Sequence, residues 1–215
     1  MGKWDVFLKL LEEKGIKYVF PKVPGLTDTL KTVWTLDDYV AWLKKIAEKE
    51  KGKIMLMGHS NGGRIALAFT HKYPQKVEKL FLVDSAGIYH NELPIKIKRV
   101  LFKGIAKVGK KLSSSKYLKN ILYKAAREKD YSQTEGPVKQ TMVNLISSDL
   151  RPILPEIKIP TVIIWGKDDT ITPIADGRVM RENIKDSVLI VLEGQHHSPQ
   201  FTNPAEVAKL IYEYI

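Results

Sequence analysis

Residues 58–62, Gly-His-Ser-Asn-Gly, place a serine between two glycines in the spacing G-x-S-x-G. The apolar run just before it, residues 54–57, indicates a strand, and residues 62–73 carry a helical pattern. A sharp strand-to-helix turn strains the serine backbone and exposes its hydroxyl, with flanking glycines avoiding collisions. A turn without chemistry is the alternative. We expect Ser60 to be a nucleophile and the backbone N–H of Asn61 to donate to a developing oxyanion.

A serine hydroxyl needs a general base to act as a nucleophile at neutral pH. Two of the five histidines, His196 and His197, follow the last predicted strand, where a loop can face Ser60. The other three lie in the turn itself, in the next helix and after the second strand; they are His59, His71 and His90. We expect His59 to point away from Ser60. The base is therefore one of the two late histidines.

A histidine base needs an acid that fixes its tautomer. Asp168 and Asp169 follow the apolar run at residues 161–165, and Asp84 follows the run at residues 80–83. A nucleophile, then an acid, then a late histidine is the chain order of one known triad, and the pair at 168–169 fits that order. Asp84 remains the competing acid.

The strands that would carry these residues are continuous apolar runs at 54–57, 80–83, 161–165 and 188–192, separated by helical patterns. This alternation predicts an α/β fold with a mostly parallel sheet. Residues 18–20, Tyr-Val-Phe, are predicted to form a further short strand. The expected sheet therefore has about five strands.

Residues 89–157 interrupt this alternation, since they carry helical patterns and no strand. One helical face joins Leu101, Ile105, Val108 and Leu112. We expect a core of residues 1–88 and 158–215 with a helical cap, residues 89–157, inserted between two strands. From Leu93 to Arg127 the cap holds eleven Lys or Arg and no acidic residue, so the whole net charge of +11 arises there. Such a segment suits contact with an anionic surface, and a solvated Lys-rich helix explains it equally well.

Composition excludes several other classes of protein. The 215 residues suffice for one domain, and the absence of cysteine excludes disulfides, thiolate metal sites and cysteine catalysis. No apolar run reaches the length of a membrane span, and the first residues lack the pattern of a secretory signal. We therefore expect a cytoplasmic protein. No nucleic-acid-binding motif is present, so no nucleic-acid partner is expected.

Three motifs in order resemble the α/β-hydrolase superfamily, in particular its small capped serine hydrolases and esterases. Residues 58–63, G-H-S-N-G-G, resemble its nucleophile elbow. Residues 165–173, W-G-K-D-D-T-I-T-P, are similar to its acid motif W-G-x-x-D-x-x-x-P, which selects Asp169. Residues 197–199, H-S-P, resemble its histidine loop and select His197, although His196 stands where glycine is usual. The resemblance implies a Ser60–His197–Asp169 triad with no metal and no cofactor.

The resemblance also has a gap at its beginning. Family members usually carry a central strand ending in His-Gly, whose loop supplies a second oxyanion donor, and here the sequence begins at the helix after that loop. This implies a truncated α/β-hydrolase fold with an exposed sheet edge. We expect that edge to favour a homodimer.

The resulting expectation is a serine hydrolase that cleaves small-molecule carboxylic esters through an acyl-enzyme intermediate. A serine in the elbow argues against the epoxide-hydrolase and dehalogenase relatives, which use aspartate. The alternatives are a non-catalytic binding or assembly protein on a degenerate hydrolase scaffold, and a fragment of a longer hydrolase.

Overall fold

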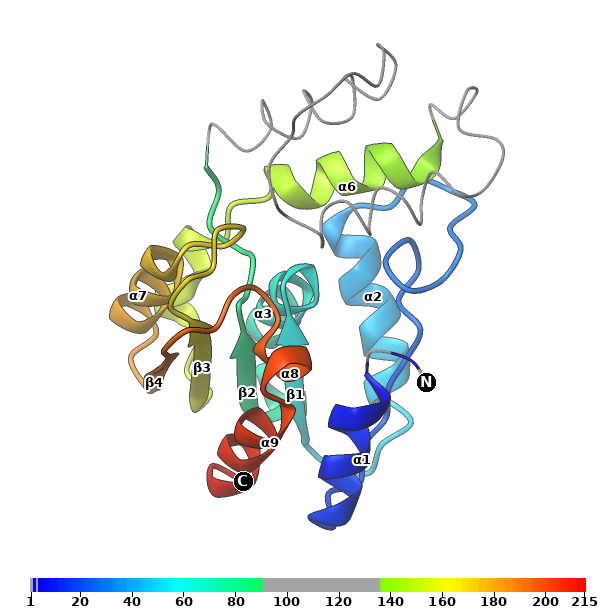
Figure 1. Ribbon diagram of the computed structural model, residues 1–215. Coiled ribbons are helices and arrows are strands. Elements are labelled where there is room, and N and C mark those ends of the chain that lie inside the picture. Colours follow the sequence, from blue (N-terminus) through cyan, green and yellow to red (C-terminus); the bar gives the residue numbers. More distant parts are fainter. Residues whose placement is uncertain (1, 3, 91–135) are drawn as a thin grey trace, which may run out of the picture.

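The computed structural model describes residue 2, residues 4–90 and residues 136–215. Within these ranges the chain folds around a parallel sheet of four strands in the order β1-β2-β3-β4 (Figure 1). The strands are β1 (Ile54–His59), β2 (Val77–Val83), β3 (Thr161–Gly166) and β4 (Ser187–Leu192). The helices are α1 (Asp5–Glu13), α2 (Leu36–Ala47), α3 (Asn61–Lys72), η1 (Pro74–Lys76), α6 (Pro137–Ser147), η2 (Arg151–Glu156), α7 (Ile174–Asn183), α8 (Pro199–Thr202) and α9 (Pro204–Glu213).

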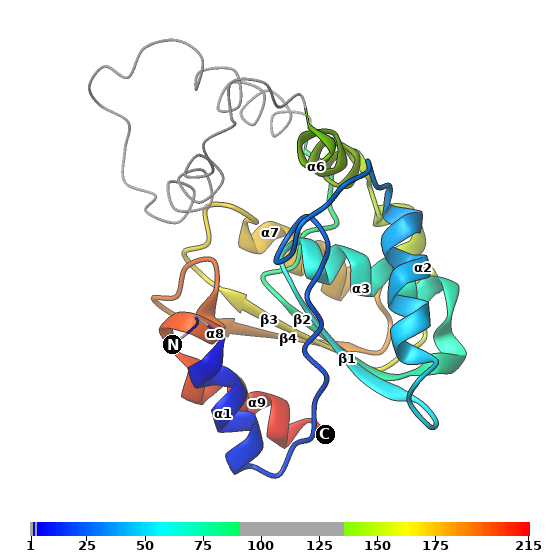
Figure 2. The same ribbon diagram turned by 90° about the vertical axis from the view of Figure 1, so that its right-hand side faces the viewer.

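Helices cover both faces of the sheet, which explains why its strands are apolar without alternation (Figure 2). On β2, Leu80 and Leu82 pack with α3 and α7, whereas Phe81 and Val83 pack with α1 and α9. The α/β fold and the four apolar runs predicted as strands are confirmed. Because the strands are parallel, the loops after β1, β2, β3 and β4 all leave the sheet where the carboxyl ends of the strands lie. We call this end of the strands the sheet edge that carries the candidate site.

The fifth predicted strand, residues 18–20, is wrong. No strand forms there, and Tyr18, Val19 and Phe20 are 37%, 60% and 43% exposed. A run of three residues is too short to hold a ladder, and the next residue, Pro21, has no N–H to donate. The Phe20 ring packs instead against Trp4, with centroids 5.1 Å apart. Among the described residues the sheet therefore has four strands, and β1 pairs only with β2.

The described part of the segment between β2 and β3 contains α6 and η2. Helix α6 is tied to the loop before α2, because the Trp34 N–H donates to Thr141 Oγ1 at 2.7 Å and Asn144 Nδ2 donates to the Trp34 carbonyl at 2.9 Å. The predicted cap face at residues 101–112 and the basic stretch at residues 93–127 lie outside the described residues. None of the helices in the described ranges combines the length and apolarity required to cross a bilayer.

Candidate active site

Ser60 occupies the turn between β1 and α3. Its backbone has φ 54° and ψ −124°, a conformation that non-glycine residues rarely adopt and that costs about 1–3 kcal/mol. Two bonds to the chain around the end of β2 hold the turn: the Ser60 N–H donates to the Val83 carbonyl at 3.2 Å, and the Ser60 carbonyl accepts from the Ala86 N–H at 2.9 Å. The sheet thus supports the strained serine from its neighbouring strand.

The two glycines of the motif differ in their surroundings. A Cβ added to Gly58 would lie 2.5 Å from the Gly62 carbonyl oxygen, so the turn excludes a side chain there, as expected. A Cβ on Gly62 would meet nothing within 4 Å, which contradicts the expected collision. The crowded position is Gly63, where an added Cβ would lie 2.1 Å from Ser85 Oγ. The close approach of α3 to the chain after β2 therefore falls one residue later than predicted.

Asn61 is the first residue of α3, so its N–H is one of the donors that the helix itself leaves unpaired. Its side chain reaches the segment above the sheet edge, since Nδ2 lies 3.4 Å from the Met142 Sδ of α6. Helix α6 is thus placed over the start of α3. This arrangement leaves the Asn61 N–H at the sheet edge that carries Ser60.

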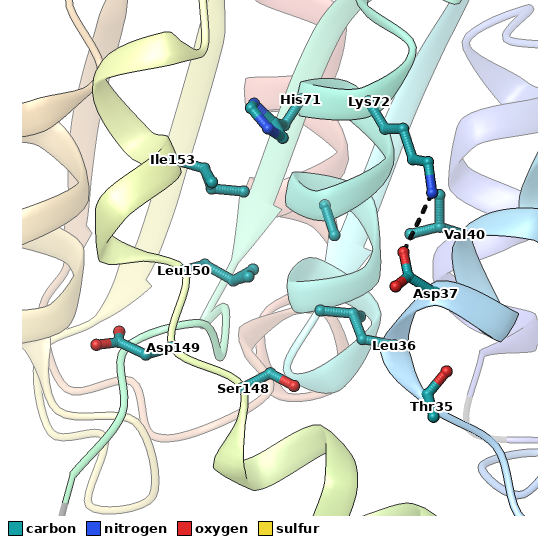
Figure 3. Close-up of a pocket in the computed structure, with 11 residues that line it drawn as sticks. Thr35, Leu36, Asp37, Val40, His71, Lys72, Ser148, Asp149, Leu150 and Ile153 are labelled. Atoms are coloured by element: carbon teal, nitrogen blue, oxygen red, sulfur yellow. Dashed lines mark hydrogen bonds and ion pairs between the residues drawn. The ribbon is translucent and has the colours of Figure 1, made fainter.

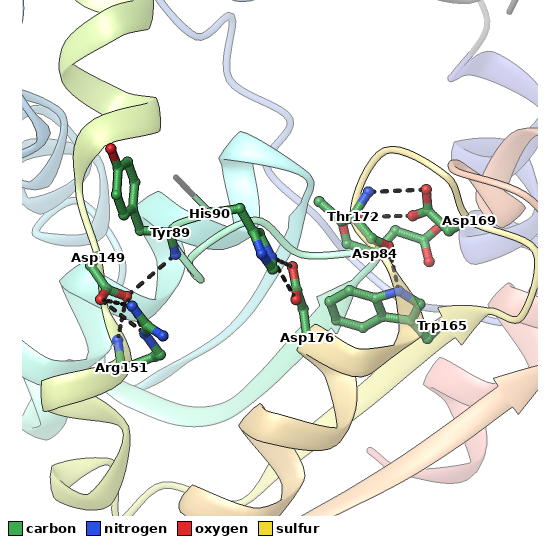
Figure 4. Close-up of polar contacts among 9 residues, drawn as sticks. All are labelled: Asp84, Tyr89, His90, Asp149, Arg151, Trp165, Asp169, Thr172 and Asp176. Atoms are coloured by element: carbon green, nitrogen blue, oxygen red, sulfur yellow. Dashed lines mark hydrogen bonds and ion pairs between the residues drawn. The ribbon is translucent and has the colours of Figure 1, made fainter. Parts of the chain in front are cut away.

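Asp169 lies on the loop after β3 with its side chain fully buried. Its Oδ1 accepts from the N–H of Ile171 at 2.7 Å. Thr172 contributes two further bonds, from its N–H to Oδ1 at 3.1 Å and from its hydroxyl to Oδ2 at 2.7 Å (Figure 4). The loop itself is anchored by Trp165, whose Nε1 donates to the Thr172 carbonyl at 2.9 Å. The carboxylate is therefore held from several directions.

His197 lies on the loop after β4, and its side chain is 5% exposed. Its Nδ1 lies 2.7 Å from Asp169 Oδ2. Because a carboxylate only accepts hydrogen bonds, the contact with Asp169 places a proton on Nδ1, which leaves Nε2 as the nitrogen that can accept a proton in the neutral form of the ring. The neighbouring His196 is exposed, and its Nδ1 bonds to the Asp168 carbonyl at 2.8 Å. The structure thus brings Asp169 and His197 together.

His59 links this pair to the elbow. Its ring lies 4.8 Å from the His197 ring, and Ser60 is the next residue in the chain. Its Nε2 lies 3.1 Å from Ser198 Oγ. Burial, and to a smaller extent the nearby His197, holds the pKa of His59 well below the ordinary range for histidine. The ring is therefore neutral at physiological pH.

Sequence reasoning missed two contacts at this edge. Thr172 Oγ1 lies within hydrogen-bond range of Asp169 and of His197 Nδ1, at 2.7 and 3.2 Å. Asp84, the competing acid, bonds through its carboxylate to two backbone N–H groups. The acid motif covers the loop that contains Thr172, but it predicts no role for the Thr172 hydroxyl.

His59, Asp84 and His197 have potential metal-ligand atoms within 4.8 Å of one another. Each of the three side chains also bonds within the protein: both Asp84 oxygens accept backbone N–H groups, His197 Nδ1 bonds to Asp169, and His59 Nε2 lies 3.1 Å from Ser198 Oγ. These contacts give each residue a structural partner without a metal ion.

A groove of about 610 Å³ lies elsewhere, between α2, the end of α3 and residues 148–153 (Figure 3). Its lining includes His71 and Lys72 from the last turn of α3, and Lys72 pairs with Asp37 across it at 3.2 Å. None of the residues of the elbow, the acid loop or the histidine loop lines this groove. It is a feature separate from the candidate active site.

A parallel sheet whose first strand leads through a strained serine into a helix is characteristic of α/β hydrolases, and this chain is an enzyme of that class. A model of the serine aminopeptidase family, S33, matches residues 31–202, which is most of the chain. The chain therefore belongs to that family.

Known relatives and solved structures agree with this assignment. The chain is 27% identical to a monoacylglycerol lipase of Mus musculus over 99% of its own length and 71% of that protein. It is 26% identical to Lipase 1 of Psychrobacter immobilis over 92% of its length and 68% of that protein. A solved carboxylesterase of the thaumarchaeon Nitrososphaera gargenis shares the fold, with a TM-score of 0.74 at 20% identity, covering 99% of this chain and 84% of that one.

Proposed function

We propose that this enzyme cleaves small-molecule carboxylic esters, with Ser60 as the nucleophile, His197 as the base and Asp169 as its orienting acid. The observation that carries the proposal is the buried Asp169–His197 hydrogen bond at the sheet edge where the strained Ser60 turn lies. The lipases among the relatives support an ester as the substrate class.

The proposed reaction has two halves. His197 Nε2 takes the proton of Ser60 Oγ as that oxygen attacks the acyl carbon, and Asp169 stabilises the imidazolium that forms. The Asn61 N–H donates to the oxyanion of the tetrahedral intermediate. His197 then returns the proton to the leaving alcohol, and an acyl-enzyme remains. In the second half, His197 takes a proton from a water molecule as the water oxygen attacks the acyl carbon. His197 then returns that proton to Ser60 Oγ as the bond between Oγ and the acyl carbon breaks, which releases the acid and regenerates Ser60.

We propose that residues 89–157 form a cap on a core of residues 1–88 and 158–215. The support lies in the described part of this segment. Met142 of α6 contacts Asn61, and Arg64 of α3 donates to the carbonyls of Leu145 and Ser148. Because α6 lies over the start of α3, the cap would border the space that a substrate occupies.

The test uses p-nitrophenyl esters of short acids together with a labelled fluorophosphonate, which reacts only with an activated serine. We expect the wild type to hydrolyse the esters and to be labelled. Ser60→Ala should lose at least about 10³-fold in rate and all labelling. Ser187→Ala is the matched control, because Ser187 begins β4 at the opposite end of the sheet; it should behave as the wild type.

Each other result points to a different function. Labelling and turnover that persist in Ser60→Ala would remove Ser60 as the nucleophile. Cleavage of amino-acid p-nitroanilides without cleavage of esters would point to a peptidase and contradict the ester substrate. A folded wild type that neither labels nor turns over would favour a binding protein on a hydrolase scaffold.

A further inference from the structure

Asp84 lies directly after β2 and is completely buried. Its Oδ1 accepts the N–H of Gly166 at 2.8 Å, and its Oδ2 accepts the N–H of Ser198, also at 2.8 Å. Its backbone has φ 41°, a left-handed conformation that is uncommon outside glycine and that aspartate adopts more readily than most other residues. One buried carboxylate therefore bonds to two segments that are 32 residues apart in the chain.

These two segments are the loops that carry the proposed acid and base. Gly166 ends β3, three residues before Asp169, and Ser198 directly follows His197. Ser198 is itself strained, with φ 100°, so its N–H needs a fixed acceptor to stay in place. Figure 4 shows Asp84 next to Thr172 and Asp169.

The main chain of Asp84 makes a third connection. Its carbonyl lies 3.1 Å from Thr172 Oγ1, and the same hydroxyl lies within hydrogen-bond range of Asp169 Oδ2 and His197 Nδ1. Asp84 also donates its own N–H to the Ile164 carbonyl of β3 at 3.0 Å. The end of β2 is thus joined to the acid loop at several points and to the histidine loop at one.

We propose that Asp84 is a positioning residue that fixes the acid loop and the histidine loop relative to each other, so that Asp169 and His197 meet in a productive geometry. This inference rests on the proposed function. Asp84 touches neither the substrate nor the reacting atoms. It acts through the backbone beside each of the two residues that do the chemistry.

The charge state of Asp84 determines whether it can hold both loops. Burial raises the pKa of Asp84 to about 6; the Ser198 and Gly166 amides lower it in part, and nearby Asp169 raises it further. His197 and the neutral His59 are the other titratable groups that face it among the described residues. Above pH 6 the ionised carboxylate accepts on both oxygens. Below pH 6 one oxygen becomes a donor and opposes an N–H group.

The variant Asp84→Asn imitates the protonated form, because its NH₂ must oppose either the Gly166 or the Ser198 amide. At pH 8 we expect kcat to fall on the order of 10- to 100-fold with KM nearly unchanged. We also expect the ratio of wild-type to variant kcat to shrink towards one as the pH falls below about 6. A general loss of stability would not produce convergence at that pH.

Two carboxamide variants serve as controls. Asp176→Asn alters another buried carboxylate, which bonds to His90 at 2.8 Å, and Asp168→Asn alters an exposed one on the acid loop. Both should keep a pH-independent ratio to the wild type. An Asp84→Asn variant within twofold of the wild-type kcat, or a ratio that does not change with pH, would overturn the proposal.

A second measurement does not depend on activity. In the Ser60→Ala background, hydrogen exchange by NMR should show protected amides at Gly166 and Ser198, and adding Asp84→Asn should lower protection of at least one by tenfold or more. If the double variant does not fold, the same two amide resonances are followed from pH 7.5 to 5 in the protein with intact Asp84, where both should shift near pH 6. Unchanged protection, or resonances that do not shift there, would refute the role of Asp84. Activity that survives Ser60→Ala would instead remove the proposed function and leave the loop connection standing.

Discussion

Asp169 differs from Asp84, the other buried carboxylate at the sheet edge, because its Oδ2 lies 2.7 Å from His197 Nδ1. An amide at this position can donate to Nδ1 and would then place the imidazole proton on Nε2, where the ring cannot accept the serine proton. The identity of this one atom, oxygen or nitrogen, sets the tautomer on which the proposed mechanism depends.

We therefore predict that Asp169→Asn lowers kcat by about 10⁴-fold while the protein remains folded. Ester hydrolysis under saturating substrate measures the rate, and near-UV circular dichroism checks the fold. Asp84→Asn should be the milder change, because Asp84 bonds only to backbone N–H groups. If Asp84→Asn proved the more damaging of the two, Asp169 would not be the acid.

His59 has a consequence for the charge of the site. In the proposed cycle His197 becomes a cation, and the His59 ring lies 4.8 Å from it. Because burial keeps the pKa of His59 well below its ordinary range, the neighbouring ring stays neutral and adds no like-charge repulsion. The residue inside the G-x-S-x-G motif thus contributes to the electrostatics of the base.

At the scale of elements, the contact between α3 and α6 depends on a buried arginine. Arg64 is 3% exposed, and its Nη1 donates to the Ser148 carbonyl at 2.6 Å and to the Leu145 carbonyl, both at the end of α6. A cation is favourable there because the helix dipole places negative charge at the C-terminus. Burial lowers the pKa of Arg64 to about 10, so the guanidinium is still charged at neutral pH.

We predict that Arg64→Met lowers the free energy of unfolding by about 1–3 kcal/mol, because it leaves two carbonyls at the end of α6 without their donor. Urea unfolding measures this change, and limited proteolysis should show earlier cleavage near α6. Arg64→Lys should recover part of the loss. The control Arg178→Met removes an exposed arginine from α7; if it costs as much as Arg64→Met, the contact with α6 does not explain the effect.

At the scale of the whole molecule, β1 and β4 are the edge strands of the sheet among the described residues. Strand β1 pairs with β2 alone among the described residues, and Met55 on β1 is 44% exposed. Exposed edges of apolar strands tend to pair with further chains. The homodimer expected from the sequence remains a prediction, and we place it at the β1 edge, whose Met55 is more exposed than Val191 on β4, at 44% against 38%.

Light scattering at low micromolar concentration should therefore give the mass of a dimer. Met55→Lys, which places a charge on the β1 edge, should shift the mass towards that of a monomer. Val138→Lys is the matched control, since Val138 is also 44% exposed but lies on α6. A monomer mass for the wild type, together with cooperative unfolding, would contradict the dimer.

Much of this architecture follows from local patterns in the sequence. All four strands were predicted from continuous apolar runs, because a parallel strand that is covered on both faces carries apolar side chains on both of them. Thr35 and Asp38, three residues apart, form a capping box at the start of α2, which is a purely local pattern. The positive φ of Ser60 agrees with the sharp strand-to-helix turn that the G-x-S-x-G spacing predicted.

Other features were decided only when distant segments met in the fold. Whether residues 18–20 form a strand depends on a partner that no local pattern specifies, and here Phe20 packs on Trp4 instead. Nothing in the sequence near Asp84 shows that its two oxygens hold Gly166 and Ser198, because those amides come from other strand ends. The sequence by itself determined which residue types stand at the carboxyl ends of the strands. Only the tertiary structure decided which of their atoms bond, because a hydrogen bond depends on distances of tenths of an ångström between loops far apart in the chain.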